Sequence, residues 1–125
     1  MWKFSNFDKM RDAVKLRYAL FPYIYTMARK TYDTGIGICR PLYYEFPDDE
    51  EAYKYEGEYF FGDDILVAPI THASSDENTV EKEIWFPAGK WWSVATGQLI
   101  EEMAIAYCAI ISFSQKLFKF ICRRN

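Results

Sequence analysis

The acidic run after Pro47 is the part of the sequence whose residue types could most readily do chemistry. Asp48 to Glu51 are four consecutive carboxylates. A catalytic pair needs surroundings that drive two pKa values apart, whereas adjacent solvated acids suit the start of a helix, where the helix dipole favours negative charge. Asp48 and Glu51 also have the spacing of a capping box. We therefore interpret the run as the cap of a short helix over residues 52–57, with an acid/base or metal-binding role as the alternative.

A second pair of acids, Asp63-Asp64, follows Gly62 between two apolar runs. Two carboxylates fall short of the roughly six oxygen ligands that a calcium loop arranges, so this sequence predicts a turn rather than a cation site. His72, the single histidine, lies in a polar loop without a nucleophile motif nearby. It is predicted to be solvated rather than catalytic.

The cysteines and glycines add no catalytic or metal motif. Cys39, Cys108 and Cys122 are widely spaced and contain no CxxC, so we interpret them as free, mostly buried thiols. Gly-Ile-Gly at residues 35–37 is too short to be a phosphate-binding loop. The sequence thus predicts no catalytic residue, no metal and no cofactor, and leaves the substrate-binding residues unknown.

Three further side chains are candidates for binding. Arg40 lies in an apolar stretch, where a buried guanidinium needs a carboxylate such as Glu45. We interpret it as a structural ion pair rather than a substrate contact. Trp91 and Trp92 are adjacent in a predicted strand, so they point to opposite faces. One is predicted to lie in the core and the other to be half-exposed, where a sugar ring could stack on it.

Composition limits the class of protein. The chain has 125 residues, half of them hydrophobic and 19% aromatic, which is enough for a core. Its net charge of −3 does not favour nucleic acid as a partner. No apolar run of signal-peptide type opens the sequence, so no export signal is predicted, and the compartment is left open.

The elements that must position these residues change in kind along the chain. Residues 8–34 predict a helix, with a break near Leu20–Phe21 because Pro22 lacks an N–H, and a stop at Gly35. The apolar face of this helix recurs at spacings of three and four residues: Phe7, Met10, Val14, Tyr18, Phe21, Tyr25, Ala28 and Tyr32. Residues 38–46 predict a strand buried on both sides.

Short strands follow from about residue 59 onward. They are predicted at 59–61, 65–70, 79–86, 91–94 and 98–101, separated by Gly, Pro and Asp turns. This spacing is typical of an antiparallel sheet. The architecture therefore changes near residue 60, from helix and strand to sheet.

Four stretches together resemble glycoside hydrolase family 31, the retaining α-glucosidases, α-xylosidases and their relatives. They occur in the family's order and spacing: LRYALFPYIYT (16–26), RPLYYEFPDD (40–49), YFFGDDILVAPI (59–70) and WFPAGKWWSVATG (85–97). The resemblance implies an α/β fragment, with the last strand and helices of a (β/α)8 barrel followed by part of an antiparallel β-sandwich. Residues 1–58 would end the barrel domain, and residues 59–102 would begin the sandwich.

The same resemblance implies that the catalytic aspartates lie elsewhere. In this family the nucleophile belongs to a W-x-D-x-N-E type motif and the acid/base is a later aspartate, both upstream of the stretch that matches 16–26. No such motif occurs in this sequence. Retaining hydrolysis needs two carboxylates on either side of the scissile bond. We therefore expect a truncated piece that is inactive alone and meets its carbohydrate substrate only within the full enzyme.

The last 23 residues differ from the rest. Residues 103–125 hold no acid and four basic residues. We interpret them as a divergent tail that could be out of frame. The apolar run is too short to span a bilayer, so the alternative is an amphipathic helix lying at a membrane surface. Of the two interpretations, membrane association is not the favoured one. For the whole chain, the alternative to the hydrolase fragment is a small non-catalytic carbohydrate-binding or interaction module.

Overall fold

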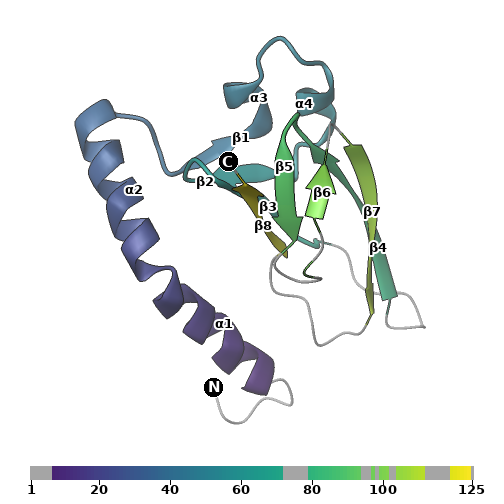
Figure 1. Cartoon of the computed structure of the whole chain (residues 1–125), viewed down its shortest axis with the longest axis horizontal. Coiled ribbons are helices and arrows are strands. Elements are labelled where there is room, and N and C mark those ends of the chain that lie inside the picture. The colour runs from purple at the N-terminus through teal and green to yellow at the C-terminus, as the bar shows by residue number, and fades with distance from the viewer. Residues whose placement is uncertain are drawn as a thin grey trace.

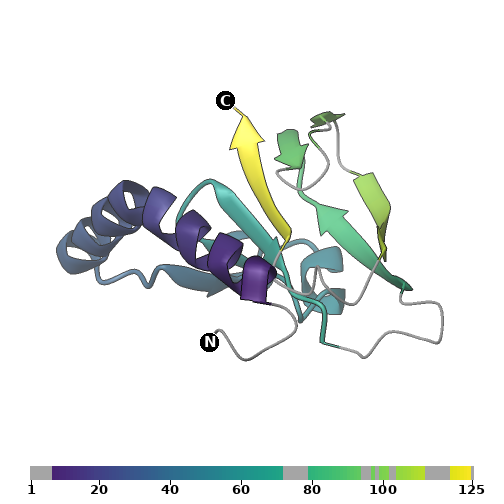
Figure 2. The ribbon, with the colours of Figure 1, turned by 90° about the horizontal axis from the view of Figure 1, so that it is seen from below.

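The protein consists of a helical arm and a mixed set of short helices and antiparallel strands. The computed structural model describes residues 7–71, 79–93, 97, 99–101, 104–111 and 119–124. The helices are α1 (Phe7–Ala19), α2 (Phe21–Thr34), α3 (Leu42–Glu45) and α4 (Glu51–Lys54). The strands are β1 (Cys39–Pro41), β2 (Tyr59–Phe61), β3 (Ile65–Ala68), β4 (Thr79–Phe86), β5 (Lys90–Ser93), β6 (Leu99–Glu101), β7 (Ala104–Ile111) and β8 (Lys119–Arg124). Figure 1 shows the helical arm on one side of the strands, and Figure 2 shows the same arrangement from below.

The helical arm is broken where the sequence predicts it. Leu20 separates α1 from α2, and Pro22 occupies the first turn of α2, where its missing N–H is tolerated. The arm ends at Gly35, which has a φ of 74° and donates its N–H to the carbonyl oxygen of Thr31 at 2.8 Å. Both the break and the glycine stop are confirmed.

The strand predicted over residues 38–46 is wrong beyond Pro41. Only Cys39–Pro41 is strand, and Leu42–Glu45 forms a turn of helix closed by the Phe46 N–H on the Leu42 carbonyl at 3.0 Å. Pro41 starts this turn, and Leu42 is 1% exposed while Tyr43 and Tyr44 face solvent. The aromatic residues are therefore not packed on both sides, and helical spacing buries Leu42 and half-buries Phe46.

The strands form two antiparallel sheets, as the turn spacing predicts. One sheet has the order β1-β2-β3-β8-β5-β6, and β4 pairs with β7 in a second. The strands predicted at 65–70 and 91–94 are Ile65–Ala68 and Lys90–Ser93. The core joins α3, α4 and both sheets through Leu42, Ala52, Phe60, Leu66, Ala68, Ile84, Trp85, Phe86 and Trp91.

The tail contributes strands. β7 pairs with β4 along its full length, and β8 lies between β3 and β5. The membrane-surface helix is therefore wrong for the described parts of the tail. Among the described helices, none is both long and apolar enough to cross a membrane. The out-of-frame interpretation of residues 103–125 stays a prediction, which sequencing of the transcript across codon 103 checks.

Candidate functional site

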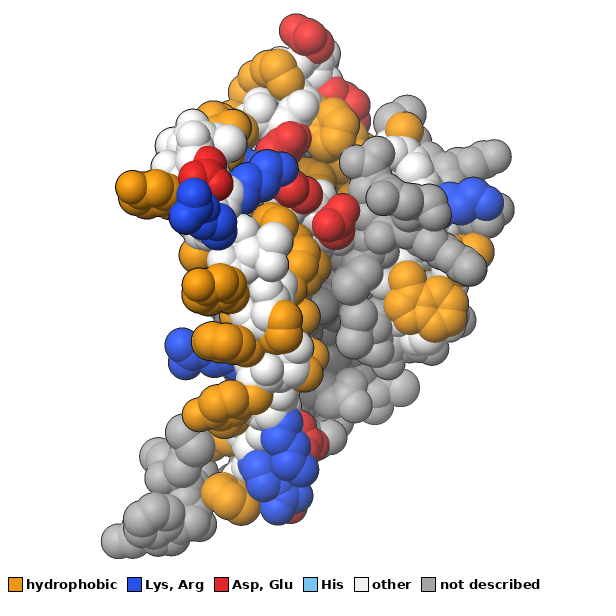
Figure 3. All heavy atoms as spheres, turned by 60° about the vertical axis from the view of Figure 1, so that its left-hand side comes forward, with side chains coloured by type: hydrophobic (Ala, Val, Ile, Leu, Met, Phe, Trp, Pro, Cys, Tyr) orange, Lys and Arg blue, Asp and Glu red, His pale blue; other side chains and the backbone are white. Residues whose placement is uncertain are grey.

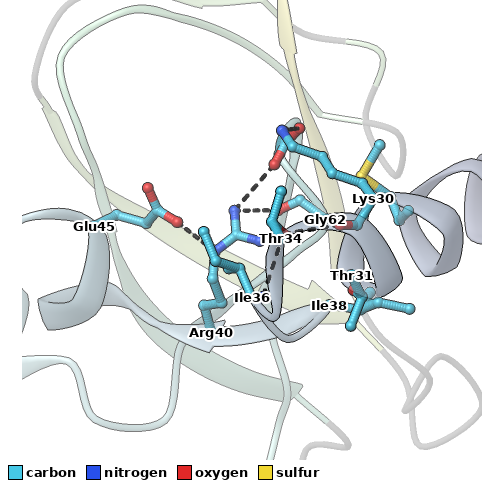
Figure 4. A pocket seen from close by; sticks show the side chains of 10 residues that line it. Lys30, Thr31, Thr34, Ile36, Ile38, Arg40, Glu45 and Gly62 are labelled. Atoms are coloured by element: carbon cyan, nitrogen blue, oxygen red, sulfur yellow. Dashed lines mark hydrogen bonds and ion pairs between the residues drawn. The ribbon is translucent and has the colours of Figure 1, made fainter.

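A cluster of charges joins the helical arm to the sheet around Arg40, and we call it the Arg40 junction (Lys30, Arg40, Glu45 and Asp63). Arg40 donates from Nε to Glu45 Oε1 and from Nη2 to Asp63 Oδ1 at 3.2 Å. It also donates to the carbonyl oxygens of Gly37 and Gly62, at 3.2 and 3.1 Å. Lys30 Nζ donates to Asp63 Oδ2 at 2.5 Å. Figure 4 shows these side chains lining one pocket.

Three elements and one turn position this cluster. Lys30 comes from α2, Arg40 from β1 and Glu45 from α3, while Asp63 comes from the turn between β2 and β3. β1 and β2 are hydrogen-bonded neighbours, so Arg40 lies opposite Phe60 and close to the turn that follows Phe61. The Arg40 side chain is only 11% exposed, and its partners satisfy it within the junction.

The junction is electrically balanced and offers no free acid or base. Two cations face two carboxylates, and both oxygens of Asp63 accept hydrogen bonds. The hydrogen bond from Lys30 is the main cause that lowers the pKa of Asp63, and Arg40 acts in the same direction. Because the pKa of Asp63 is lowered, its stabilising contribution is present at neutral pH and is lost only on acidification below the ordinary aspartate range. The ion pair expected for Arg40 with Glu45 is present.

Replacement of Arg40 by methionine tests this structural role. The variant keeps most of the side-chain length but leaves two carbonyls, the Glu45 carboxylate and one oxygen of Asp63 without the Arg40 donor, so we expect a loss of about 1–3 kcal/mol in the free energy of unfolding. The carboxylates are about a third exposed, which keeps the loss below that of a fully buried pair. Urea unfolding followed by tryptophan fluorescence measures it. Lys30→Met, from the exposed side of the same cluster, is the matched control and should lose less than about 1 kcal/mol.

The Gly-Asp-Asp sequence forms the predicted turn. Tyr23 of α2 donates its hydroxyl to the Phe61 carbonyl at 3.0 Å and accepts the Asp64 N–H at 3.2 Å. Asp63 is committed to the two cations of the Arg40 junction. In the described ranges, no group of three or more His, Cys, Asp or Glu side chains is arranged to hold a metal ion.

The acidic run does lead into a helix, but not by the predicted cap. The helix is Glu51–Lys54 instead of 52–57, and the Asp49 carboxylate accepts the Glu51 N–H at 3.0 Å. Glu50 stands at the N-cap without a side-chain cap bond, so the capping box of Asp48 with Glu51 is wrong. Asp49 takes this place because its side chain reaches the backbone two residues on, as in an Asx turn. Asp48 and Glu50 are exposed.

The two tryptophans point to opposite faces, as predicted. Trp91 is 1% exposed and donates its indole N–H to the Pro87 carbonyl at 2.7 Å. Trp92 is 42% exposed. His72 lies outside the described residues.

The cysteines are only partly described. Cys39 is free and exposed, so the predicted burial is wrong for this thiol. It occupies the outer side of edge strand β1, where the alternation of the strand buries Arg40 instead. Cys108 and Cys122 lie in β7 and β8, with side chains outside the described part of the structure.

The sequence did not identify Glu58 as a candidate. This glutamate precedes β2, is 2% exposed, and accepts the backbone N–H of Trp85 on Oε1 at 3.2 Å. Burial raises the pKa of Glu58 to about 8. Nothing in the polar stretch before Tyr59 separates this acid from its solvated neighbour Glu56, since the difference arises from β4 packing over it.

Comparisons with known proteins show which family the chain resembles. The model of the glycosyl hydrolase family 31 C-terminal domain matches residues 35–117. An α-glucosidase of Saccharolobus solfataricus is 37% identical over 98 residues, covering 78% of this chain and 13% of the relative. An α-xylosidase of the same organism is 40% identical over 89 residues, covering 70% of this chain and 12% of the relative.

A solved structure extends the similarity to nearly the whole chain. A GH31 α-xylosidase from a soil metagenome, crystallised with xylose, superposes with a TM-score of 0.84 at 30% identity. The superposition covers 98% of this chain and 17% of that one. This chain thus spans about an eighth of the length of the curated relatives that it matches. Since the family model covers most of its residues, the chain belongs to glycosyl hydrolase family 31, in the part that forms the family's C-terminal domain.

Proposed function

We propose that this chain forms the C-terminal part of a retaining glycosidase that hydrolyses α-glucosides or α-xylosides, with both catalytic aspartates in another part of that enzyme. In this proposal, residues 1–58 complete a (β/α)8 barrel and residues 59–102 begin the following β-sandwich. The activities named for the relatives supply the substrate class. The described carboxylates support the placement of the catalytic aspartates in another part of the enzyme, because Glu45 and Asp63 are paired with cations and Glu58 is buried.

An exposed apolar stripe on the helical arm is the observation that carries the proposal. Its members lie at helical spacings on one face of α1 and α2, and all face solvent: Val14, Tyr18, Phe21, Tyr25 and Tyr32. Tyr32 is 82% exposed. Figure 3 shows hydrophobic side chains following the arm. Such a contiguous apolar row marks a contact surface.

The opposite face of α2 contacts the sheet. Tyr23 and Lys30 lie about half a turn away from the stripe, and both bond to the turn between β2 and β3. Met27, on the same side, approaches Gly62. The arm is therefore attached through this side, while its most apolar side is left for a further layer. The rest of the barrel is that layer in our proposal.

A chimera tests this proposal. The matching C-terminal segment of the Saccharolobus α-glucosidase is replaced by this chain, and hydrolysis of 4-nitrophenyl α-glucoside and α-xyloside is measured. We expect the chimera to hydrolyse one of them and the isolated chain to hydrolyse neither. Phe21→Ser with Tyr25→Ser should abolish activity of the chimera, because the stripe no longer packs. The exposed pair Asp12→Ser with Lys15→Ser, outside the stripe, is the matched control and should leave activity unchanged.

Two results would contradict the proposal. Hydrolysis by the isolated chain would place catalytic carboxylates within it. Full activity of the Phe21→Ser, Tyr25→Ser chimera would show that the stripe covers nothing in the enzyme.

A non-catalytic carbohydrate-binding module is the second candidate, and one observation favours it. Trp92 is 42% exposed and stands opposite Leu99, which is 39% exposed, in the β5–β6 pair. An exposed indole on a sheet can stack on a sugar ring. Saturable binding of the chain to an α-glucan, lost in Trp92→Ala, would support this module over the hydrolase part.

A further inference from the structure

Glu58 is a buried acid with only one of its two oxygens satisfied in the described structure. Its Oε1 accepts the Trp85 N–H at 3.2 Å, whereas Oε2 is buried without a partner among the described residues. An ionised carboxylate in this position would forfeit hydration on the unpaired oxygen. A neutral carboxyl needs far less compensation, and its Oε1 still fastens Glu58 to β4.

The groups around Glu58 come from two elements. From β4, Lys82 attracts a negative charge on Glu58 and Glu83 repels it. Lys82 Nζ donates to the Pro69 carbonyl at 2.7 Å and lies 3.5 Å from where a Cβ on Gly57 would stand. From the end of α4, Tyr55 donates its hydroxyl to Glu83 Oε1 at 2.9 Å. Lys82 is therefore occupied elsewhere but close to the backbone that carries Glu58.

We propose that Glu58 is a proton-dependent latch between strand β4 and the segment leading into β2, closed while its carboxyl is neutral and loosened when the carboxyl ionises. Ionisation places a charge inside the core beside Trp85, so the fold either pulls Lys82 away from Pro69 or opens this edge of β4. The latch is independent of the proposed hydrolase role, because it requires no substrate and no catalytic aspartate.

The direction of the pH effect follows from proton binding. The pKa of Glu58 is raised from 4.5 to about 8 by folding, mainly through burial. Between these values the folded chain holds a proton that the unfolded chain has released, so stability falls as the pH rises. The stabilisation that the neutral carboxyl contributes is fully present below the unfolded pKa of 4.5. It declines as the pH rises towards the folded pKa of about 8, and the stability then levels off.

Urea unfolding of the full chain and of Glu58→Gln between pH 6 and 9.5 tests the latch. The amide keeps the carbonyl that faces Trp85 but cannot ionise. We expect the ratio of the wild-type to the Glu58→Gln unfolding constant to rise about tenfold per pH unit up to about pH 8 and then to level off. Glu56→Gln, which removes an exposed carboxylate two residues before Glu58, is the matched control and should not reproduce this change.

Two further measurements test the latch. Lys82→Met should extend the decline to higher pH, because the only cation acting on Glu58 among the described residues is removed. The backbone amide resonance of Trp85 in the wild type should shift between pH 7 and 9, even if Glu58→Gln does not fold. A Trp85 amide that does not titrate, or parallel pH profiles for wild type and Glu58→Gln, would overturn the latch.

Discussion

Replacement of Trp91 by alanine should lower the free energy of unfolding by about 3–5 kcal/mol, since it leaves a cavity where one of the largest buried side chains of the core packs. Trp91 is 1% exposed and packs against Phe60 and Phe86, with ring centroids 6.2 and 6.4 Å away. Removal of the indole N–H also leaves the Pro87 carbonyl without its hydrogen-bond donor. Urea unfolding followed by far-UV circular dichroism measures the loss without relying on tryptophan emission.

Trp92→Ala is the matched control, because the same residue type is deleted one position along the same strand. Trp92 is 42% exposed, and its loss should cost less than about 1 kcal/mol. The two variants thus compare the stability cost of deleting a buried tryptophan with that of deleting a half-exposed one. Equal costs for Trp91→Ala and Trp92→Ala would contradict the assignment of Trp91 to the core.

The sequence predicts those parts of the fold that local rules decide. Pro22 and Gly35 act through their own backbones, so the break and the end of the helical arm could be located within a residue or two. The alternation of Trp91 and Trp92 likewise follows from strand geometry alone. The turn at Gly62 to Asp64 is decided by short-range backbone preferences.

Features that depend on distant segments could not be predicted. The apolar stripe was visible in the spacing of Val14 to Tyr32, but periodicity does not say whether a neighbouring layer is present, and the described residues leave this face exposed. Strand β8 inserts between β3 and β5. Such a non-local pairing has no short-range signal.

The residues of the candidate site also differ in how far the sequence predicts their contacts. The partnership of Arg40 and Glu45 could be inferred because the two residues are close in sequence and a buried guanidinium must be paired. The burial of Glu58 beside Trp85 could not, because Trp85 lies more than twenty residues away in the sequence. The strand predicted after Pro41 is wrong because it requires side chains packed on both sides, whereas Tyr43 and Tyr53 stack on each other at the surface, with centroids 5.5 Å apart.

Replacement of Gly62 by alanine should be the other strongly destabilising change, at about 3 kcal/mol or more, because it combines backbone strain with a clash. Gly62 has a φ of 71°, a conformation that costs an alanine roughly 1–2 kcal/mol. A Cβ there would also lie 2.7 Å from Tyr23 Cζ and 2.8 Å from Met27 Cγ, with the Tyr23 hydroxyl closer still. The side chains that attach α2 to the sheet would have to move, and the Tyr23 bonds to Phe61 and Asp64 would weaken.

Gly35→Ala separates the two causes. Gly35 has a similar φ of 74°, but a Cβ there would have no neighbour within 4 Å among the described residues. This variant should therefore show the strain alone, about 1–2 kcal/mol by urea unfolding. Gly62→Ala combined with Tyr23→Phe should relieve only the contact with the hydroxyl, because the ring Cζ at 2.7 Å and Met27 Cγ at 2.8 Å still clash with the added Cβ. If Gly62→Ala costs no more than Gly35→Ala, the helical arm does not pack against this turn as described. The orientation of the arm would then no longer support the proposal that the stripe on its opposite face contacts a further layer.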